Sequence, residues 1–415
     1  DCTFRSLPKR VLRTLRQKPG ECRPSRLAAG RNDQLRGGLV VVMDLSQSIH
    51  RHHGTRVLLS LIAGSVGGLL FFWLSLPLPW MLGSMLLVSV GALCGMPFNR
   101  SVRLRKGTIA VMGLLLGSYF SADALSQLSL WFLAALLVSI YVVTMTIFSL
   151  STFRRVGLMD LPTAYFSSMP GGLAPMTIAG EEAGGDSQLI PIAHVIRIFC
   201  VVSSVPIYLA LVPGVELAPV SLTLSEVFVL PPWKDWFIWG LCALVGFFGA
   251  RAIRMPFGEI LGPMILCATV YIFEVVTVTL PPFVTIAAQI VIGTSIGTQF
   301  AQLRGRHVLR TVITSMGTTI VMLAGALIVA ELMAPLLGMN PLSLLLALVP
   351  GGLVEMGLIA VALDADTAFI SAMHTWRIIL IAASAPLLFG LIGRRLPWTS
   401  RHSTKSADKP DVRSG

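Results

Sequence analysis

Long apolar stretches separated by short polar connections make up most of this chain. A helix of about 20 apolar residues crosses the ~30 Å hydrocarbon core of a bilayer. The alternation of apolar and polar residues that marks strands is absent, so the pattern predicts helices and not a barrel. Stretches of spanning length lie at 57–76, 80–97, 128–150, 187–212, 235–252, 258–279, 308–333 and 367–393, and shorter ones at 107–122 and 283–301. The pattern therefore predicts ten transmembrane helices.

The polar residues within these stretches recur after about 180 positions. Residues 170–176 read PGGLAPM, and residues 350–356 read PGGLVEM. The same register pairs Asp186 with Asp366, His194 with His374, Arg197 with Arg377, and Gly113-x-x-x-Gly117 with Gly293-x-x-x-Gly297; one residue out of step, Pro77 and Leu82-Gly83 pair with Pro256 and Leu261-Gly262. Charged residues are costly inside a membrane, so their recurrence at fixed offsets indicates an internal duplication.

Lysine and arginine are concentrated in alternate loops, and the phase differs between the two copies. In the first copy they lie before the first span, after the second and after the fourth: Arg51, Arg56, Arg100, Arg103, Arg105, Lys106, Arg154 and Arg155. In the second copy they lie after the first, the third and the last span: Arg251, Arg254, Arg304, Arg306, Arg310, Arg394 and Arg395. Basic loops face the cytoplasm. The copies are therefore predicted to be inverted, with both chain termini in the cytoplasm.

Inverted copies need an odd number of crossings. Each copy, however, has six apolar segments: five of the ten stretches above and one further segment that contains Pro-Gly-Gly. The fifth segment, at 160–183 and 343–363, has Pro-Gly-Gly near its middle. Proline removes a backbone donor and glycine disfavours helix, so each segment is predicted to be a helix–break–helix hairpin that enters and leaves on one side. The alternative is a single kinked span, which would make the repeats parallel; the phase of the loop charges favours the hairpin.

We therefore predict an all-α integral membrane protein of two inverted-topology repeats, each with five transmembrane helices and one Pro-Gly-Gly re-entrant hairpin. Composition agrees, with 54% hydrophobic and 13% charged residues. Because 1–56 holds twelve Lys and Arg against four Asp and Glu, and the first methionine is Met43, we expect residues 1–42 to be poorly ordered or to precede the true start. The predicted parts are a basic, disordered tail (1–56), membrane repeat 1 (57–212), an external linker (213–234), membrane repeat 2 (235–393) and a polar cytoplasmic tail (394–415).

Arg197 and Arg377 are the candidates for a binding site. Arg197 lies eleven residues after Asp186, about 16 Å along a helix and near the middle of a bilayer. Arg377 has the same depth from the opposite side. A midplane arginine costs at least about 2.5 kcal/mol on insertion scales, so it should face protein, water or an anion. Either a clamp on carbonyls freed by the breaks or a substrate contact fits, and the two roles are compatible.

The neighbouring polar residues have two interpretations each. Asp186 and Asp366 are suited to cap the N-termini of the last helices of each copy. His194 and His374 lie one turn before the arginines, where they either hydrogen-bond in helix packing or couple protons, since histidine titrates near neutrality. The glycine pairs 113/117 and 293/297 are predicted to permit close helix packing.

The two breaks complete the predicted site. After Pro170 and Pro350 the chain resumes as a short helix whose positive N-terminus points into the protein, and two inverted copies would bring both N-termini together at mid-membrane. Glu355 replaces Pro175 beside the second break. The predicted substrate-binding residues are Arg197, Arg377, His194, His374, Gly171, Gly172, Gly351, Gly352 and Glu355. Four other glutamates have no acidic counterpart in the other copy: Glu181, Glu182, Glu259 and Glu274. Each is either a carrier of protons or cations or a packing partner.

The duplicated motif resembles the membrane AbrB family over about 57–393. The residues that carry it are Pro170-Gly171-Gly172-Leu173 with His194-x-x-Arg197, and Pro350-Gly351-Gly352-Leu353 with His374-x-x-Arg377. These bacterial proteins have a duplicated membrane domain and are also labelled ammonia monooxygenases. The resemblance implies a multi-pass protein of the bacterial inner membrane, and the family name implies regulation of gene expression. Because only the tail lies outside membrane sequence, no nucleic-acid partner is expected.

These observations favour a secondary transporter or channel for a small polar or anionic solute, with its site at the repeat interface. The alternative is a membrane-embedded sensor that influences gene expression. A monooxygenase fits less well, because oxygen chemistry needs clustered copper or iron ligands and only His194 and His374 lie within the spans. We expect no enzyme activity, cofactor or metal. The expected partners are the lipid bilayer and the solute, with a homo-oligomer left open.

Overall fold

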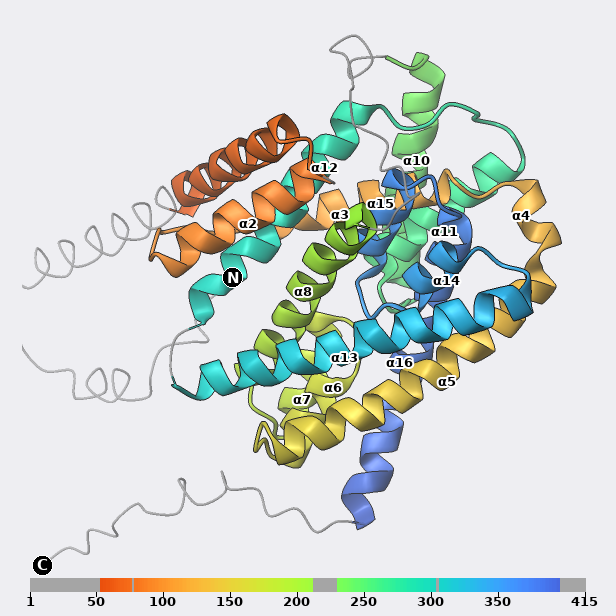
Figure 1. Ribbon diagram of the computed structural model, residues 1–415. Coiled ribbons are helices and arrows are strands. Elements are labelled where there is room, and N and C mark those ends of the chain that lie inside the picture. Colours follow the sequence, from red (N-terminus) through yellow and green to blue (C-terminus); the bar gives the residue numbers. More distant parts are fainter. Residues whose placement is uncertain (1–52, 77, 212–229, 304–305, 396–415) are drawn as a thin grey trace, which may run out of the picture. The chain divides into compact units, whose positions relative to one another are not determined.

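The computed structural model describes residues 53–76, 78–211, 230–303 and 306–395. Residues 1–52, most of the predicted linker and residues 396–415 lie outside the described residues. The described residues form helices and no strand: His53–Trp73, α2 (Pro79–Leu93), α3 (Val102–Gly117), α4 (Ala122–Ser126), α5 (Leu128–Arg155), α6 (Leu161–Ser168), α7 (Leu173–Glu182), α8 (Leu189–Leu211), α10 (Trp233–Ala252), α11 (Gly258–Ile272), α12 (Pro282–Gly297), η1 (Thr298–Gln302), α13 (Arg306–Leu337), α14 (Pro341–Leu348), α15 (Leu353–Ala362) and α16 (Thr367–Arg395) (Figure 1).

Seven of the described helices are long and apolar enough to cross a membrane. They are His53–Trp73, Leu128–Arg155, Leu189–Leu209, Trp233–Ala252, Pro282–Ala301, Val308–Leu337 and Thr367–Leu391. Three other predicted spans correspond to α2, α3 and α11, which have 15, 16 and 15 residues. At 1.5 Å per residue these helices are about 23 Å long, less than the ~30 Å core of a bilayer. That all ten helices cross a membrane stays a prediction.

The long helices expose large apolar side chains over their outer faces. Phe132 and Ile147 of α5 are 75% and 63% exposed, and Ile320 and Leu332 of α13 are 60% and 61% exposed. Water-soluble proteins rarely expose apolar surface on this scale, whereas lipid tails accept it. The helical fold and this apolar surface identify a membrane-type protein.

Two pairs of glycines let α2 pack on α12 and α3 pack on α11. A Cβ added to Gly113 or Gly117 of α3 would overlap with the carbonyl oxygen of Ile260 or Met264 on α11. At the equivalent crossing, a Cβ on Gly293 or Gly297 of α12 would meet the carbonyl oxygens of Met81 and Met85 on α2. Backbone therefore touches backbone at both crossings, which confirms the packing role predicted for these glycines.

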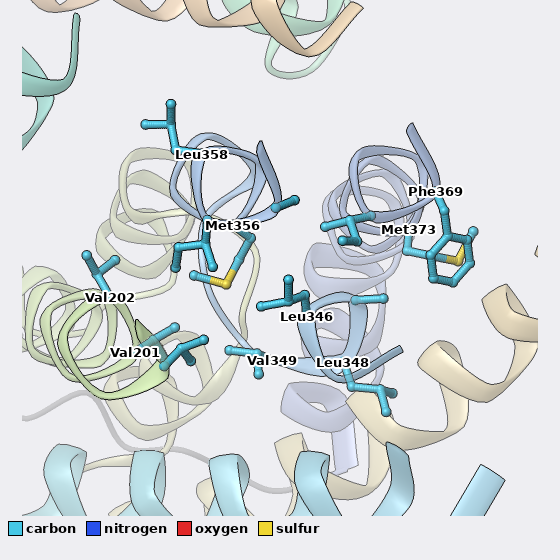
Figure 2. Close-up of a cluster of buried hydrophobic side chains, with 14 of the residues drawn as sticks. Val201, Val202, Leu346, Leu348, Val349, Met356, Leu358, Phe369 and Met373 are labelled. Atoms are coloured by element: carbon cyan, nitrogen blue, oxygen red, sulfur yellow. The ribbon is translucent and has the colours of Figure 1, made fainter. Parts of the chain in front are cut away.

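The helix α14 lies in the middle of the core. Its residues Leu346 and Leu348, with Val349, pack among Val201 and Val202 of α8, Met356 and Leu358 of α15, and Phe369 and Met373 of α16 (Figure 2). The helix α15 is buried along most of its length, whereas the equivalent α7 buries only Met176 and Gly180. The two copies thus have the same order of elements but different burial at their second half-helices.

The duplication extends to unusual backbone conformations. Left-handed φ angles recur at equivalent positions of the two copies: Ser75 (52°) and Arg254 (53°), Leu78 (47°) and Phe257 (55°), Gly95 (88°) and Glu274 (55°), Leu158 (53°) and Gly338 (64°), and Gly184 (82°) and Asp364 (50°). Most of these residues are not glycine, so the conformation is imposed by the surrounding packing. Gly172 (89°) departs from this rule, because Gly352 has a φ of −80°.

Candidate functional site

The first Pro-Gly-Gly motif interrupts the helix, as predicted. α6 ends at Ser168, Met169 is extended, and α7 begins at Leu173 after Gly172 in the left-handed region. Such a break leaves the last carbonyls of α6 without helical donors. Inside a membrane protein, these groups need partners from the protein itself.

Two side chains of α8 supply those partners. Arg197 donates from Nη1 to the carbonyl of Met169 at 3.1 Å and from Nη2 to the carbonyl of Ser167. His194 places Nε2 3.1 Å from the carbonyl of Phe166. The Arg197 side chain is buried, at 4% exposure. These bonds confirm that Arg197 clamps the broken end of α6.

The second break repeats two of these three carbonyl contacts 180 residues later, while the Nη2 atom of the arginine bonds a different carbonyl. His374 places Nε2 2.9 Å from the carbonyl of Leu346, and Arg377 donates from Nη1 to the carbonyl of Val349 at 2.8 Å and from Nη2 to that of Gly351. Arg377 Nη2 also lies 2.7 Å from Nδ1 of His374. A carbonyl only accepts and Arg only donates, so His374 is neutral, with its proton on Nε2. Both histidines thus hydrogen-bond a carbonyl at a helix break, as the packing interpretation predicts, and a role of either in proton coupling or substrate binding stays a prediction.

The aspartates at the start of α8 and α16 act as N-caps. Oδ1 of Asp186 accepts from the backbone N–H groups of Gln188 at 2.8 Å and Leu189 at 3.1 Å. Oδ1 of Asp366 accepts from the N–H of Phe369 at 2.9 Å. Each bond satisfies a donor that the first turn of a helix leaves free. The capping role predicted for both residues is confirmed.

A cavity of about 640 Å³ lies where the two breaks meet. It is lined by both prolines of the breaks and by most of the predicted site: Pro170, Gly172, His194, Arg197, Pro350, Gly351, Gly352, Glu355 and Arg377. Gly171 and His374 are not among the lining residues, and both are buried. Gly171 packs against Ile381 and Met176, and His374 is held by Leu346 and Arg377.

Sequence reasoning missed the basic residues at this cavity. Arg105 and Lys106 of α3, Arg251 of α10 and Arg254 in the following loop all line it. In the sequence they indicated only the orientation of the loops, because nothing local shows that these loops reach the breaks. Lys106 is paired with Glu259 of α11 at 2.6 Å. Among the described lining residues, six arginines and lysines stand against two glutamates.

A strained loop closes one side of the first break. Phe257 has a left-handed φ of 55°, and its ring lies so close to Gly172 that an added Cβ would come within 2.7 Å of two ring carbons. Gly172 thus needs to be glycine both for its φ of 89° and for this contact. The duplicated Pro256 and Leu261-Gly262 were the sequence signal that could have pointed to this loop.

The acidic residues that break the symmetry are spread over different places. Glu355 and Glu259 line the cavity, but Glu181, Glu182 and Glu274 do not. Within the described ranges, no group of three or more His, Cys, Asp and Glu side chains is placed to hold a metal ion.

Comparison with known proteins adds two kinds of similarity. The family model described as "Transition state regulatory protein AbrB" matches residues 80–393. The chain is 24% identical over 356 residues to "Uncharacterized protein YhjN" of Bacillus subtilis (strain 168), covering 79% of this chain and 91% of that protein. It is 25% identical over 334 residues to "Putative regulator AbrB" of Escherichia coli (strain K12), covering 79% of this chain and 93% of that protein.

Proposed function

This chain belongs to the AbrB family, and we propose that it is a secondary transporter or channel for a small anionic or polar solute that binds in the cavity between the two helix breaks. The observation that carries the proposal is the convergence of Pro170, Pro350, Arg197 and Arg377 on one cavity. Broken helices that meet between two repeats form the substrate sites of many secondary transporters. One fold can serve many functions, and here the cavity and its charges favour transport.

We propose that the two repeats are inverted, each with five crossings and one re-entrant hairpin. The phase of the basic loops supports this arrangement, as does the recurrence of carbonyl contacts around Arg197 and Arg377. In this orientation both termini lie in the cytoplasm and the protein resides in the bacterial inner membrane.

The charge of the cavity favours an anion. Six of its described lining residues are arginine or lysine, and the half-helix α7 directs its positive N-terminus toward it. In a site partly shielded from water, these charges attract a small anion and repel cations. Arg197 and Arg377 each bond two carbonyls and also line the cavity, so a structural role and a binding role are compatible.

We propose that access is from the cytoplasmic side. The charged lining residues Arg105 and Arg251 lie at the ends of α3 and α10, beside loops that the positive-inside rule places there. The residues in the other copy equivalent to Arg251 and Glu259 are Phe72 and Trp80, whose rings stack at 5.6 Å. One face of the proposed site is thus charged, and at the equivalent place in the other copy two stacked aromatic rings stand instead.

A membrane-embedded sensor is the second candidate. The printed names of the family model and of the Escherichia coli relative both refer to regulation. A sensor would use the same cavity to bind a ligand, but it would not move that ligand across the membrane.

Purified protein in proteoliposomes separates the two candidates. Vesicles with an internal pH dye or a radiolabelled solute are given gradients of small carboxylates and inorganic anions, with empty vesicles as the baseline. We expect flux that depends on one of these anions and that is lost in Arg197→Leu protein shown by size exclusion to be folded. Ligand-induced thermal stabilisation without any flux would favour the sensor.

A further inference from the structure

The N-terminus of α15 is filled by a side chain of the same helix. Glu355 lies in the first turn, and its Oε2 atom sits where a Cβ on Gly352 would be. The first N–H groups of a helix lack helical partners, and the helix dipole favours negative charge at this end. Glu355 therefore occupies the place that a bound anion would take.

The equivalent position on α7 carries no such group. Pro175 replaces Glu355, and it has neither a carboxylate nor an N–H. The first-turn N–H groups of Leu173 and Ala174 have no helical acceptor, and both residues line the cavity. The preceding glycines differ as well, since Gly172 has a φ of 89° and Gly352 a φ of −80°. The backbone thus differs between the N-terminus of α15, where the Glu355 carboxylate lies, and the N-terminus of α7, which has no carboxylate of its own.

A second observation points to an anion at the same cavity. Arg377 lines the cavity and is 1% exposed. Its Nε has no hydrogen-bond partner within the described part of the chain. Among the described residues, the hydrogen-bond partners of its guanidinium are two carbonyls and the His374 ring. A buried cation with neutral partners alone is costly, so negative charge in the cavity would offset this cost. The charge of Arg377 at the cavity wall therefore favours an anion.

We infer that Glu355 is a tethered carboxylate filling one of two pseudo-equivalent anion positions, and that the other position, at the N-terminus of α7, receives the carboxylate group of a small ligand. This inference rests on the cavity of the proposed function and adds the ligand class. Because Glu355 shows that a carboxylate fits the second position, a carboxylate is the chemistry expected at the first. Glu355 also makes the site one-sided, so that one ligand anion binds and not two.

Chemical rescue tests the inference. Glu355→Ala empties the position, and added acetate should refill it. In the full-length protein purified in detergent, we expect Glu355→Ala to lower the Tm, and acetate to raise the Tm of this variant by more than it raises that of the wild type. Acetamide, which has the same shape without charge, and chloride at equal ionic strength should not reproduce the extra shift.

Two matched variants separate the position from general effects of acetate. Glu355→Gln keeps the volume of the side chain filled, so it should show no extra shift with acetate. Glu331→Ala removes an exposed glutamate of α13 that does not line the cavity, and it should behave like the wild type. If Glu355→Ala does not fold, Glu355→Pro takes its place, because it copies the first repeat, and the same extra shift is expected.

The α7 position has its own variant. Pro175→Glu places a tethered carboxylate there as well, and it should reduce the acetate-dependent shift of the wild type to that seen with chloride. Equal acetate shifts in the wild type, Glu355→Ala and Pro175→Glu would overturn the inference. Anion flux in proteoliposomes could still be present in that case, so the proposed function stands or falls by a separate measurement.

Discussion

Gly172 and Gly352 hold equivalent places in the two Pro-Gly-Gly breaks, yet their backbones differ, with φ of 89° and −80°. Each is restricted for a different reason. Gly172 adopts a conformation open mainly to glycine and lies against the ring of Phe257, whereas Gly352 makes room for the carboxylate of Glu355. The asymmetry of the cavity therefore begins at the glycines that position the two half-helices.

The loss of stability caused by alanine should depend on Glu355 at Gly352 but not at Gly172. Gly172→Ala should lower stability by about 1–3 kcal/mol because of its backbone conformation, whether or not Glu355 is present. Gly352→Ala should be destabilising beside Glu355 but well tolerated in the Glu355→Ala background, since its φ is ordinary. Thermal unfolding of the three single and two double variants measures this coupling. Equal effects of Gly352→Ala in both backgrounds would contradict the contact with Glu355.

The arginine clamps should matter for stability as well as for binding. Arg197→Leu or Arg377→Leu leaves two buried carbonyls without donors, and we expect a loss on the order of 2–4 kcal/mol from the hydrogen bonds alone. Lysine should restore stability only in part, because it lacks the planar fork that reaches two carbonyls.

Thermal unfolding of both leucine and lysine variants, with and without acetate, checks this expectation. A leucine variant that unfolds like the wild type and keeps its anion response would remove that arginine from both roles.

The helix crossings predict which glycines tolerate a methyl group. Gly113→Ala and Gly293→Ala push a Cβ into the backbone of α11 and α2, so both should be destabilising by about 1–3 kcal/mol. Gly240→Ala and Gly317→Ala are matched controls on α10 and α13, where nothing lies within 4 Å of the added Cβ. These controls should be neutral or gain up to about 1 kcal/mol from better helix propensity. Thermal stability of the four variants tests the packing, and a destabilising pair of controls would contradict it.

Single cysteines report the proposed inversion of the repeats. After all six cysteines (Cys2, Cys22, Cys94, Cys200, Cys242 and Cys267) are replaced by alanine, a cysteine is placed at Arg103, Asp123, Arg154 or Lys234. With the protein in the bacterial membrane, an impermeant thiol reagent added outside should label positions 123 and 234, while 103 and 154 should react only after the cells are opened. Labelling of positions 103 and 234 from the same side would contradict the inversion and indicate parallel repeats.

The sequence by itself determined the local features of this protein. Apolar length predicts the helices, Pro-Gly-Gly predicts the two breaks, and Asp186 and Asp366 predict their caps, because helix formation and capping depend on residues within a turn or two. The close packing at Gly113 and Gly293 was also predictable, since a repeated small residue in an apolar helix has few other uses. The cost of Arg197 and Arg377 in a membrane made them candidates before any contact was known.

Only the tertiary structure decided which residues share the cavity and how the two copies differ. Arg105, Lys106, Arg251 and Arg254 reach the breaks through packing between segments far apart in the chain, so they looked like ordinary loop charges. The filled end of α15 and the empty end of α7 depend on where one carboxylate folds back and on the different burial of the two helices. A repeated sequence predicts equivalent contacts, but the packing around each copy decides whether they form, because side chains from distant helices fill the space that each copy leaves.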